Sequence, residues 1–193
     1  MKRRELVRVL GAGSLLGVAG MMGGCAASGG SGGPHVVVVG GGFGGATAAK
    51  YIRMWSEKSI RVTLIEPNAD FVSCPISNLV LGGSKTMADI TVSYDNLAKR
   101  HGVNVVRDRV SGIDADKRTV KLANGGELGY DRLILSPGID FMWEALPGMN
   151  KPGAQEKVLH AWKAGPQTVA LRKQLEAMPD GGVYALTIPL APY

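Results

Sequence analysis

The sequence has 193 residues and a formal net charge of +6, and half of that charge lies in residues 1–8, which hold four basic side chains and one acid. The other basic residues are scattered and aromatic residues are few, which excludes nucleic acid as a partner. About 160 residues remain beyond the N-terminal segment, which is enough for one domain.

Residues 1–32 predict an export signal followed by a linker. A basic start with Arg3-Arg4 precedes an uncharged stretch over residues 9–34, and its apolar part, 9–22, is shorter than the ~20 residues of a membrane span. With small residues around Cys25, this pattern is typical of a twin-arginine signal. We therefore expect a periplasmic protein without a stable membrane span. A retained anchor and lipidation at Cys25 are the alternatives.

The stretch from His35 to Glu66 combines the elements of a dinucleotide-binding unit. An apolar valine run predicts a strand buried on both faces, a helix is expected from Ala46, and a second strand ends at Glu66. The motif G-x-G-x-x-G lies between the first strand and the helix. Its members are Gly40, Gly42 and Gly45. Strand, glycines, helix, second strand and terminal acid together predict that this segment binds a dinucleotide.

Each residue of the motif has a physical task. Gly40 permits the tight turn out of the strand, Gly42 lets a pyrophosphate approach the backbone, and Gly45 lets helix and strand pack closely. The helix start offers unpaired N–H groups to the phosphates. Glu66 stands where a carboxylate accepts hydrogen bonds from the adenosine ribose.

Cys74 is expected to be the one thiol of the mature chain, because the other cysteine, Cys25, falls in the export signal. Pro75 fits the first position of a short helix, which makes Cys74 its N-cap, where the thiolate is favoured. The eight residues after Glu66 span up to ~26 Å when extended. Cys74 can therefore lie beside a flavin ring at the far end of the dinucleotide, and a buried unreactive cysteine is the alternative.

The rest of the first domain predicts an inserted β-meander. A helix over residues 94–101 and a strand over 103–106 precede short strands at 110–113, 119–122 and 127–128. A buried strand then ends at Ser136-Pro137-Gly138. A domain for NAD alone would continue with alternating strands and helices, whereas an inserted meander before the final strand resembles the FAD domain of flavoproteins with two dinucleotide-binding domains. This resemblance implies a Rossmann-like α/β, three-layer FAD-binding domain.

The domain boundary is expected near residue 150. Residues 33–150 form the FAD-binding domain, and 151–193 form connecting helices and the first strand of a second Rossmann-like domain. Residues 156–178 predict two helices interrupted at Gly165-Pro166. Residues 183–188 predict a fresh strand.

Four stretches resemble the flavoprotein subunits of flavocytochrome c sulfide dehydrogenase, relatives of sulfide:quinone oxidoreductase. They are VVVVGGGFGGATAAKYI, VTLIEPNADFVSCPISNLVLGG, YDRLILSPGID and HAWKAGPQTVALRKQLEAMPDGG. The resemblance implies FAD as cofactor, with a thioether from Cys74 to the 8α-methyl group of the flavin. It adds Val110, Ser136 and Gly138 to the cofactor-binding candidates, although Ser136-Pro137-Gly138 replaces the usual Ala-Thr-Gly. It further implies sulfide as the substrate and a c-type cytochrome subunit as the partner in a heterodimer.

The resemblance also predicts that this chain is an N-terminal fragment, truncated at the start of its second domain. Members of the family are much longer, and their pair of redox cysteines lies beyond the part represented here. We therefore expect no catalytic residue, no metal site and no turnover within these 193 residues. The alternatives are a quinone-reducing relative and an exported dinucleotide-binding remnant without catalysis.

Overall fold

The computed structural model describes residues 32–187. The predicted export signal lies outside the described residues, as does the end of the strand predicted at 183–188. Within the described part, no helix is both long enough and apolar enough to cross a bilayer.

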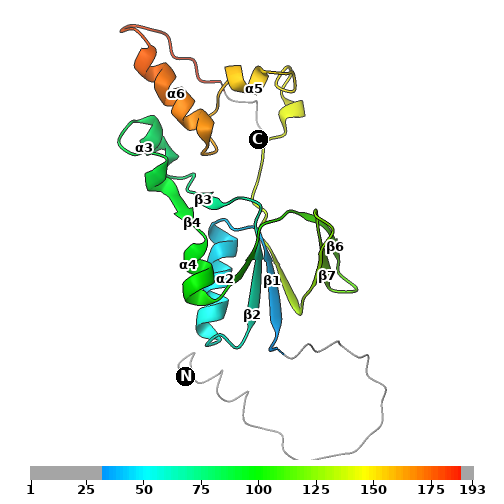
Figure 1. Ribbon diagram of the computed structural model, residues 1–193. Coiled ribbons are helices and arrows are strands. Elements are labelled where there is room, and N and C mark those ends of the chain that lie inside the picture. Colours follow the sequence, from blue (N-terminus) through cyan, green and yellow to red (C-terminus); the bar gives the residue numbers. More distant parts are fainter. Residues whose placement is uncertain (1–31, 188–193) are drawn as a thin grey trace, which may run out of the picture. The chain divides into compact units, whose positions relative to one another are not determined.

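A four-stranded parallel sheet forms the centre of the fold (Figure 1). Its order is β5-β2-β1-β9, in which β1 spans His35–Val39, β2 Arg61–Ile65, β5 Asn104–Val106 and β9 Arg132–Leu135. In a Rossmann-like fold, the first strand likewise lies between the second strand and a strand that comes later in the chain. Because all pairs are parallel, the carboxyl ends of the four strands meet at one edge, where such sheets bind ligands.

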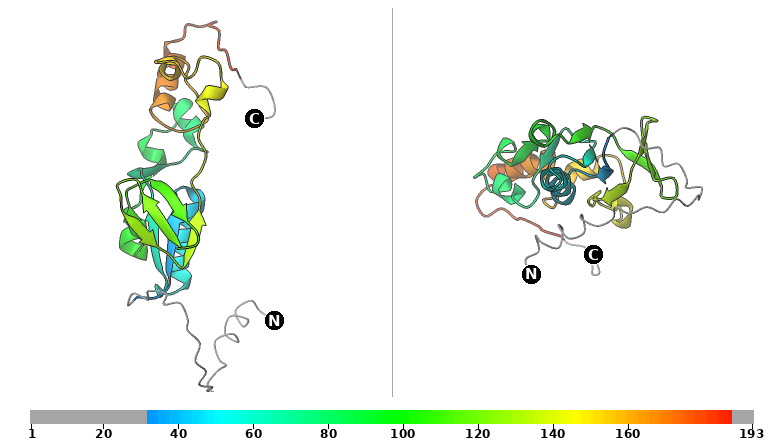
Figure 2. Two further views of the ribbon diagram at one scale, coloured as in Figure 1. Left: turned by 90° about the vertical axis from the view of Figure 1, so that its right-hand side faces the viewer. Right: turned by 90° about the horizontal axis from the view of Figure 1, so that it is seen from below.

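Different elements pack on the two faces of the parallel sheet. Helices α2 (Phe43–Trp55) and α4 (Asp95–His101) lie on one face, and the meander of β6 (Val110–Asp114), β7 (Thr119–Leu122) and β8 (Glu127–Gly129) lies on the other. In Figure 2, left, the meander faces the viewer in front of the parallel sheet. The predicted three-layer Rossmann-like fold is confirmed.

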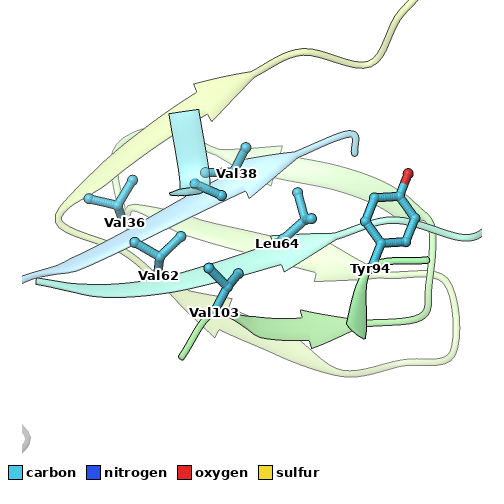
Figure 3. Packing of buried hydrophobic residues seen from close by; sticks show 7 residues of the cluster. Val36, Val38, Val62, Leu64, Tyr94 and Val103 are labelled. Atoms are coloured by element: carbon cyan, nitrogen blue, oxygen red, sulfur yellow. The ribbon is translucent and has the colours of Figure 1, made fainter. Parts of the chain in front are cut away.

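Alternation along β1 explains why both faces have a core. Val36 and Val38 pack toward the helices, and Val37 packs toward the meander with Val120 and Leu122. Successive strand residues point to opposite faces, so a run of valines can fill both layers. The residues of the helix-side cluster are drawn in Figure 3, where those labelled are Val36, Val38, Val62, Leu64, Tyr94 and Val103.

A two-stranded antiparallel ribbon follows β2 and was not predicted. It consists of β3 (Asp70–Val72) and β4 (Thr91–Ser93). Between them lie the short helix α3 (Ser77–Leu81) and a 3₁₀ turn at Ala88–Ile90. No local pattern indicates β3, because its partner β4 comes about twenty residues later in the chain.

Residues beyond the last sheet strand differ from the prediction. A 3₁₀ turn at Trp143–Ala145 comes first, then α5 (Ala154–Lys157), which is one turn long, and α6 (Pro166–Ala177). The segment between α5 and α6 is not helical, since His160 and Trp162 pack around Phe141 instead. The predicted strand does not form over 183–187, where Val183 is 92% exposed, because no described strand pairs with it.

Candidate functional site

The glycine loop connects β1 to α2 at the carboxyl edge of the sheet. Gly40 has φ +94°, which a side chain rarely adopts, and a Cβ built there would collide with the Ser136 carbonyl oxygen. A Cβ on Gly45 would collide with the Gly40 carbonyl oxygen and lie 3.2 Å from Cγ1 of Val38. The turn at Gly40 and the close helix–strand packing at Gly45 thus have the geometry expected from their spacing.

The outer side of the loop is open. Gly42 is the N-cap of α2, and a Cβ built on it would meet no heavy atom within 4 Å. No side chain caps this helix end and no acidic residue occupies its first turn, so its first N–H groups are free to bind an anionic group. A groove of about 300 Å³ borders the loop between α2, α4 and the β3–β4 ribbon. This open, uncapped helix start fits the pyrophosphate of a dinucleotide.

Glu66 follows β2 and is only 7% exposed. Its Oε2 accepts a hydrogen bond of 2.7 Å from the Gly41 N–H. Its Oε1 accepts one of 2.8 Å from the Asn68 N–H and one of 2.7 Å from the Asn68 side-chain amide. A carboxylate accepts about four hydrogen bonds, so three donors orient Glu66 and leave capacity for a ribose hydroxyl.

Tyr94, the N-cap of α4, supports the loop from the inside. Its hydroxyl donates to the Gly41 carbonyl oxygen over 2.9 Å. Burial raises the pKa of Tyr94 to about 12, and the negative charge of Glu66 adds to the shift. The hydroxyl therefore keeps its proton and remains a donor throughout the neutral range.

The candidates on the last sheet strand and the meander have different positions. The Ser136 N–H donates to the Val39 carbonyl over 2.8 Å, and its own carbonyl lies against Gly40, which places it beside the loop. Gly138 adopts φ +79° in open surroundings. Val110 is the first residue of β6, and its side chain packs in the meander-side core. The side chain of Val110 is partly buried there.

Cys74 is a free, exposed cysteine, so the alternative of a buried cysteine is wrong. The predicted helix N-cap at Cys74 is also wrong, since α3 begins at Ser77 with Ile76 as its N-cap. Cys74 instead opens a turn in which its carbonyl accepts hydrogen bonds from the N–H and hydroxyl of Ser77, because this compact turn satisfies the carbonyl before the helix starts. Its thiol donates to the Trp162 carbonyl over 2.8 Å.

An aromatic cluster lies around this contact. The Phe141 ring centroid is 4.5 Å from that of His160 and 5.0 Å from that of Trp162, and Trp143 packs against Phe141 at 4.5 Å. Burial lowers the pKa of His160, as does the charge of Lys163, while Asp140 opposes the shift. The neutral imidazole is thus favoured within this apolar group.

The structure brings five of the eight candidates to one edge of the sheet. Those five are Gly40, Gly42, Gly45, Glu66 and Ser136. Sequence reasoning missed Asn68 and Tyr94. Asn68 had a local signal, since an asparagine after Glu66-Pro67 is typical of a turn whose amides bond nearby groups, whereas Tyr94 had none, being 53 residues from Gly41.

Fold and site together define a Rossmann-like dinucleotide-binding protein. Residues 34–178 match the family model described as pyridine nucleotide-disulphide oxidoreductase. The chain belongs to this family, and membership supports FAD as the dinucleotide.

Three relatives show how the chain compares with known proteins. It is 61% identical over 38 residues to the sulfide dehydrogenase [flavocytochrome c] flavoprotein chain of Chlorobaculum thiosulfatiphilum, covering 20% of this chain and 77% of that one. It is 30% identical over 97 residues to mouse mitochondrial sulfide:quinone oxidoreductase, covering 50% of this chain and 21% of that protein. The structure of sulfide:quinone oxidoreductase from Aquifex aeolicus matches with a TM-score of 0.60 and 26% identity, over 74% of this chain and 32% of that one. The chain thus spans about a third or less of these last two proteins.

Proposed function

We propose that this chain is the FAD-binding N-terminal part of an exported, periplasmic flavoprotein that oxidises sulfide and passes the electrons to a c-type cytochrome subunit. The observation that carries the proposal is the 61% identity to the flavoprotein chain of a flavocytochrome c sulfide dehydrogenase. The chain spans a small share of its longer relatives, so the activity is proposed for the intact protein.

The glycine loop and Glu66 would hold the ADP half of FAD. The free N–H groups at the start of α2 would bind the pyrophosphate, and the remaining acceptor capacity of Glu66 would take a ribose hydroxyl. Bound FAD supplies the ability to take up two electrons together and release them singly. These residues therefore bind and orient, and they take no proton from the substrate.

Cys74 would hold the flavin end through a thioether to the 8α-methyl carbon, a bond that replaces the S–H bond of Cys74 and one C–H bond of the methyl group and leaves the two electrons and two hydrogens on the flavin ring. Three features support this role. The thiol is exposed, it is free, and the Trp162 carbonyl orients it. Cys74 is the one cysteine among residues 32–187, so the proposed sulfide-reacting disulfide would come from outside that part of the chain.

Acid precipitation of the intact protein tests the tether. We expect yellow colour to stay with the denatured pellet of the unsubstituted protein and to move to the supernatant for Cys74→Ser. Ser73→Ala, at the residue next to Cys74 in the chain, is the matched control and should keep its colour in the pellet. Colour in the supernatant of the unsubstituted protein would refute the thioether, and a colourless protein would favour a non-catalytic remnant.

A quinone-reducing enzyme is the second candidate function. The similarity to two sulfide:quinone oxidoreductases favours it. Giving the intact protein sulfide together with either cytochrome c or a soluble ubiquinone analogue separates the two functions. Faster reduction of cytochrome c supports the first proposal, and faster reduction of the quinone supports the second.

A further inference from the structure

The glycine loop is held by a residue outside the dinucleotide motif. Gly41 lies in the middle of the loop and is bonded at both of its polar backbone groups. Its N–H donates to Oε2 of Glu66 over 2.7 Å, and its carbonyl accepts from the Tyr94 hydroxyl over 2.9 Å. Tyr94, Gly41 and Glu66 therefore form one hydrogen-bonded series.

The Tyr94 ring also limits how far the loop can move inward. A Cβ built on Gly41 would lie 2.6 Å from the Tyr94 hydroxyl oxygen and 2.7 and 2.8 Å from the adjacent ring carbons Cζ and Cε1. The loop backbone thus lies directly against the ring edge. The ring contact and the hydrogen bond to Gly41 both come from Tyr94, so both hold the loop in the same position.

Tyr94 itself is rigidly placed. It is 5% exposed and belongs to the helix-side core cluster with Leu64 and Val103. In Figure 3 its oxygen lies at the end of the ring remote from Val103. Its backbone carbonyl accepts hydrogen bonds from the N–H groups of Leu97 and Ala98, which anchor it to the first turn of α4. Because the backbone and the ring of Tyr94 are both held in place, its hydroxyl can position the Gly41 carbonyl that it contacts.

We propose that Tyr94 is a positioning residue for the dinucleotide, which acts through Gly41 to keep the loop N–H groups and the Glu66 carboxylate aligned for pyrophosphate and ribose. The proposal rests on the FAD binding proposed above. It adds a residue from the β4–α4 junction to a site otherwise built from the motif and from Glu66.

The chemistry of the bond requires the protonated hydroxyl. A carbonyl oxygen only accepts hydrogen bonds, so Tyr94 has to be the donor. Removing the hydroxyl would leave the buried Gly41 carbonyl without this partner, and the loop would have to move toward another donor or toward water. Either movement displaces the Gly41 N–H from Glu66.

Tyr94→Phe tests the proposal, because it keeps the ring and removes only the hydroxyl. The substitution is made in the intact protein carrying Cys74→Ser, so that FAD can be removed and returned. ADP is the probe, since it is the part of FAD that the loop and Glu66 would hold. We expect the Kd for ADP to rise about tenfold, which corresponds to the loss of one buried hydrogen bond.

Tyr130→Phe is the matched control. Tyr130 packs in the core cluster on the meander side of the sheet, so its loss of a hydroxyl should leave the Kd for ADP unchanged. The visible circular dichroism of bound FAD should change for Tyr94→Phe and not for Tyr130→Phe, because only the first alters how the cofactor is held. If Tyr94 contributed only to stability, Tyr94→Phe would leave the Kd for ADP and the visible circular dichroism of bound FAD as they are in the protein with Tyr94 intact.

Two outcomes separate this inference from the proposed function. If the protein with Tyr94 intact binds FAD and ADP, and Tyr94→Phe binds ADP equally well, the positioning role is overturned and the proposed function stands. If the protein with Tyr94 intact binds neither, both fail. Should Tyr94→Phe not fold, proton exchange of the Tyr94 hydroxyl in the unsubstituted apoprotein, followed by NMR, decides. Slow exchange of the hydroxyl proton supports its bond to the Gly41 carbonyl, and exchange as fast as at an exposed tyrosine overturns the positioning role.

Discussion

Residues 33–138, the sheet region, and residues 139–187, the C-terminal region, bury their side chains to different degrees. Nearly all the large side chains that are fully buried belong to the sheet region, and Thr168 is the exception. The C-terminal region is less than half as long as the sheet region and exposes as many large apolar side chains, namely Ile139, Met142, Leu146, Val158, Trp162, Met178, Val183, Tyr184 and Leu186. The sheet region therefore completes its own core, and the C-terminal region does not.

The difference follows from how each region is covered. A parallel sheet needs a layer on each face, and α2 with α4 and the meander supply these from nearby sequence. The C-terminal region has one longer helix, α6, which contacts α3. One such contact buries little apolar surface, so we expect this region to open at a lower free energy than the sheet.

Replacing a core leucine should give the largest effect. Leu64 is 0% exposed in the centre of the sheet, and we expect Leu64→Ala in the 193-residue chain to cost about 3 kcal/mol of unfolding free energy. Leu186→Ala, at a side chain that is 76% exposed, should change it by less than about 0.5 kcal/mol. Urea unfolding followed by circular dichroism measures both. Equal losses would mean that the two regions share one core.

A change in α6 should have a smaller and more local effect. Leu171 is buried in α6, and Leu171→Ala should cost about 2 kcal/mol by loosening its packing. Amide hydrogen exchange should then become faster in α6 and α3 and stay unchanged in β2. Lys173→Ala, at an exposed position of the same helix, is the control. Faster exchange in β2 as well would show that the two regions open together.

The smallest expected effect is a pH dependence from His35. Its ring contacts the Gly129 carbonyl through Nδ1 at 2.9 Å and the Thr63 hydroxyl through Nε2 at 2.8 Å. Burial lowers the pKa of His35, and Arg61 lowers it further, while the hydrogen bond to Gly129 and the charge of Asp131 raise it in part. The unfolded chain thus binds a proton near the ordinary value of 6.5, and the folded chain resists it.

Proton linkage sets the direction in which stability changes with pH, because the unfolded chain binds a proton at His35 more readily than the folded chain. Stability should be complete above pH 6.5 and should decrease as the pH falls below 6.5 toward the lowered pKa of His35. We expect His35→Gln to flatten this decrease in the melting temperature between about pH 7.5 and about pH 5. His160→Gln, in the C-terminal region, should alter global melting less, although the pKa of His160 is also lowered. An unchanged slope for His35→Gln would contradict the prediction.

Much of the sheet region could be predicted because its signals are local. The valine run, the glycine motif and the acid after β2 lie within 32 residues, and each depends on backbone conformation or burial that neighbouring residues dictate. The predictions of a helix that continues beyond α5 and of a strand at 183–187 failed because contacts with distant residues decided these segments. Helical spacing around Trp162 was overridden by packing on Phe141, and the apolar run at 183–187 has no described strand to pair with.

The same division holds within the site. Gly40 and Gly45 could be assigned from spacing, because a tight turn and a close helix–strand contact require glycine at those positions. The orientation of the Glu66 carboxylate and the support of Gly41 by Tyr94 could not, since they depend on atoms brought together by the sheet.

The sequence by itself determined the order of strand, glycine loop, helix and acid, because these features depend on short-range sterics and on hydrophobic periodicity. Only the tertiary structure decided which face of the loop stays open, which side chain supports its other face, and where the Cys74 thiol bonds. Those contacts join residues that are far apart in the chain, and packing selects them only once the layers have formed.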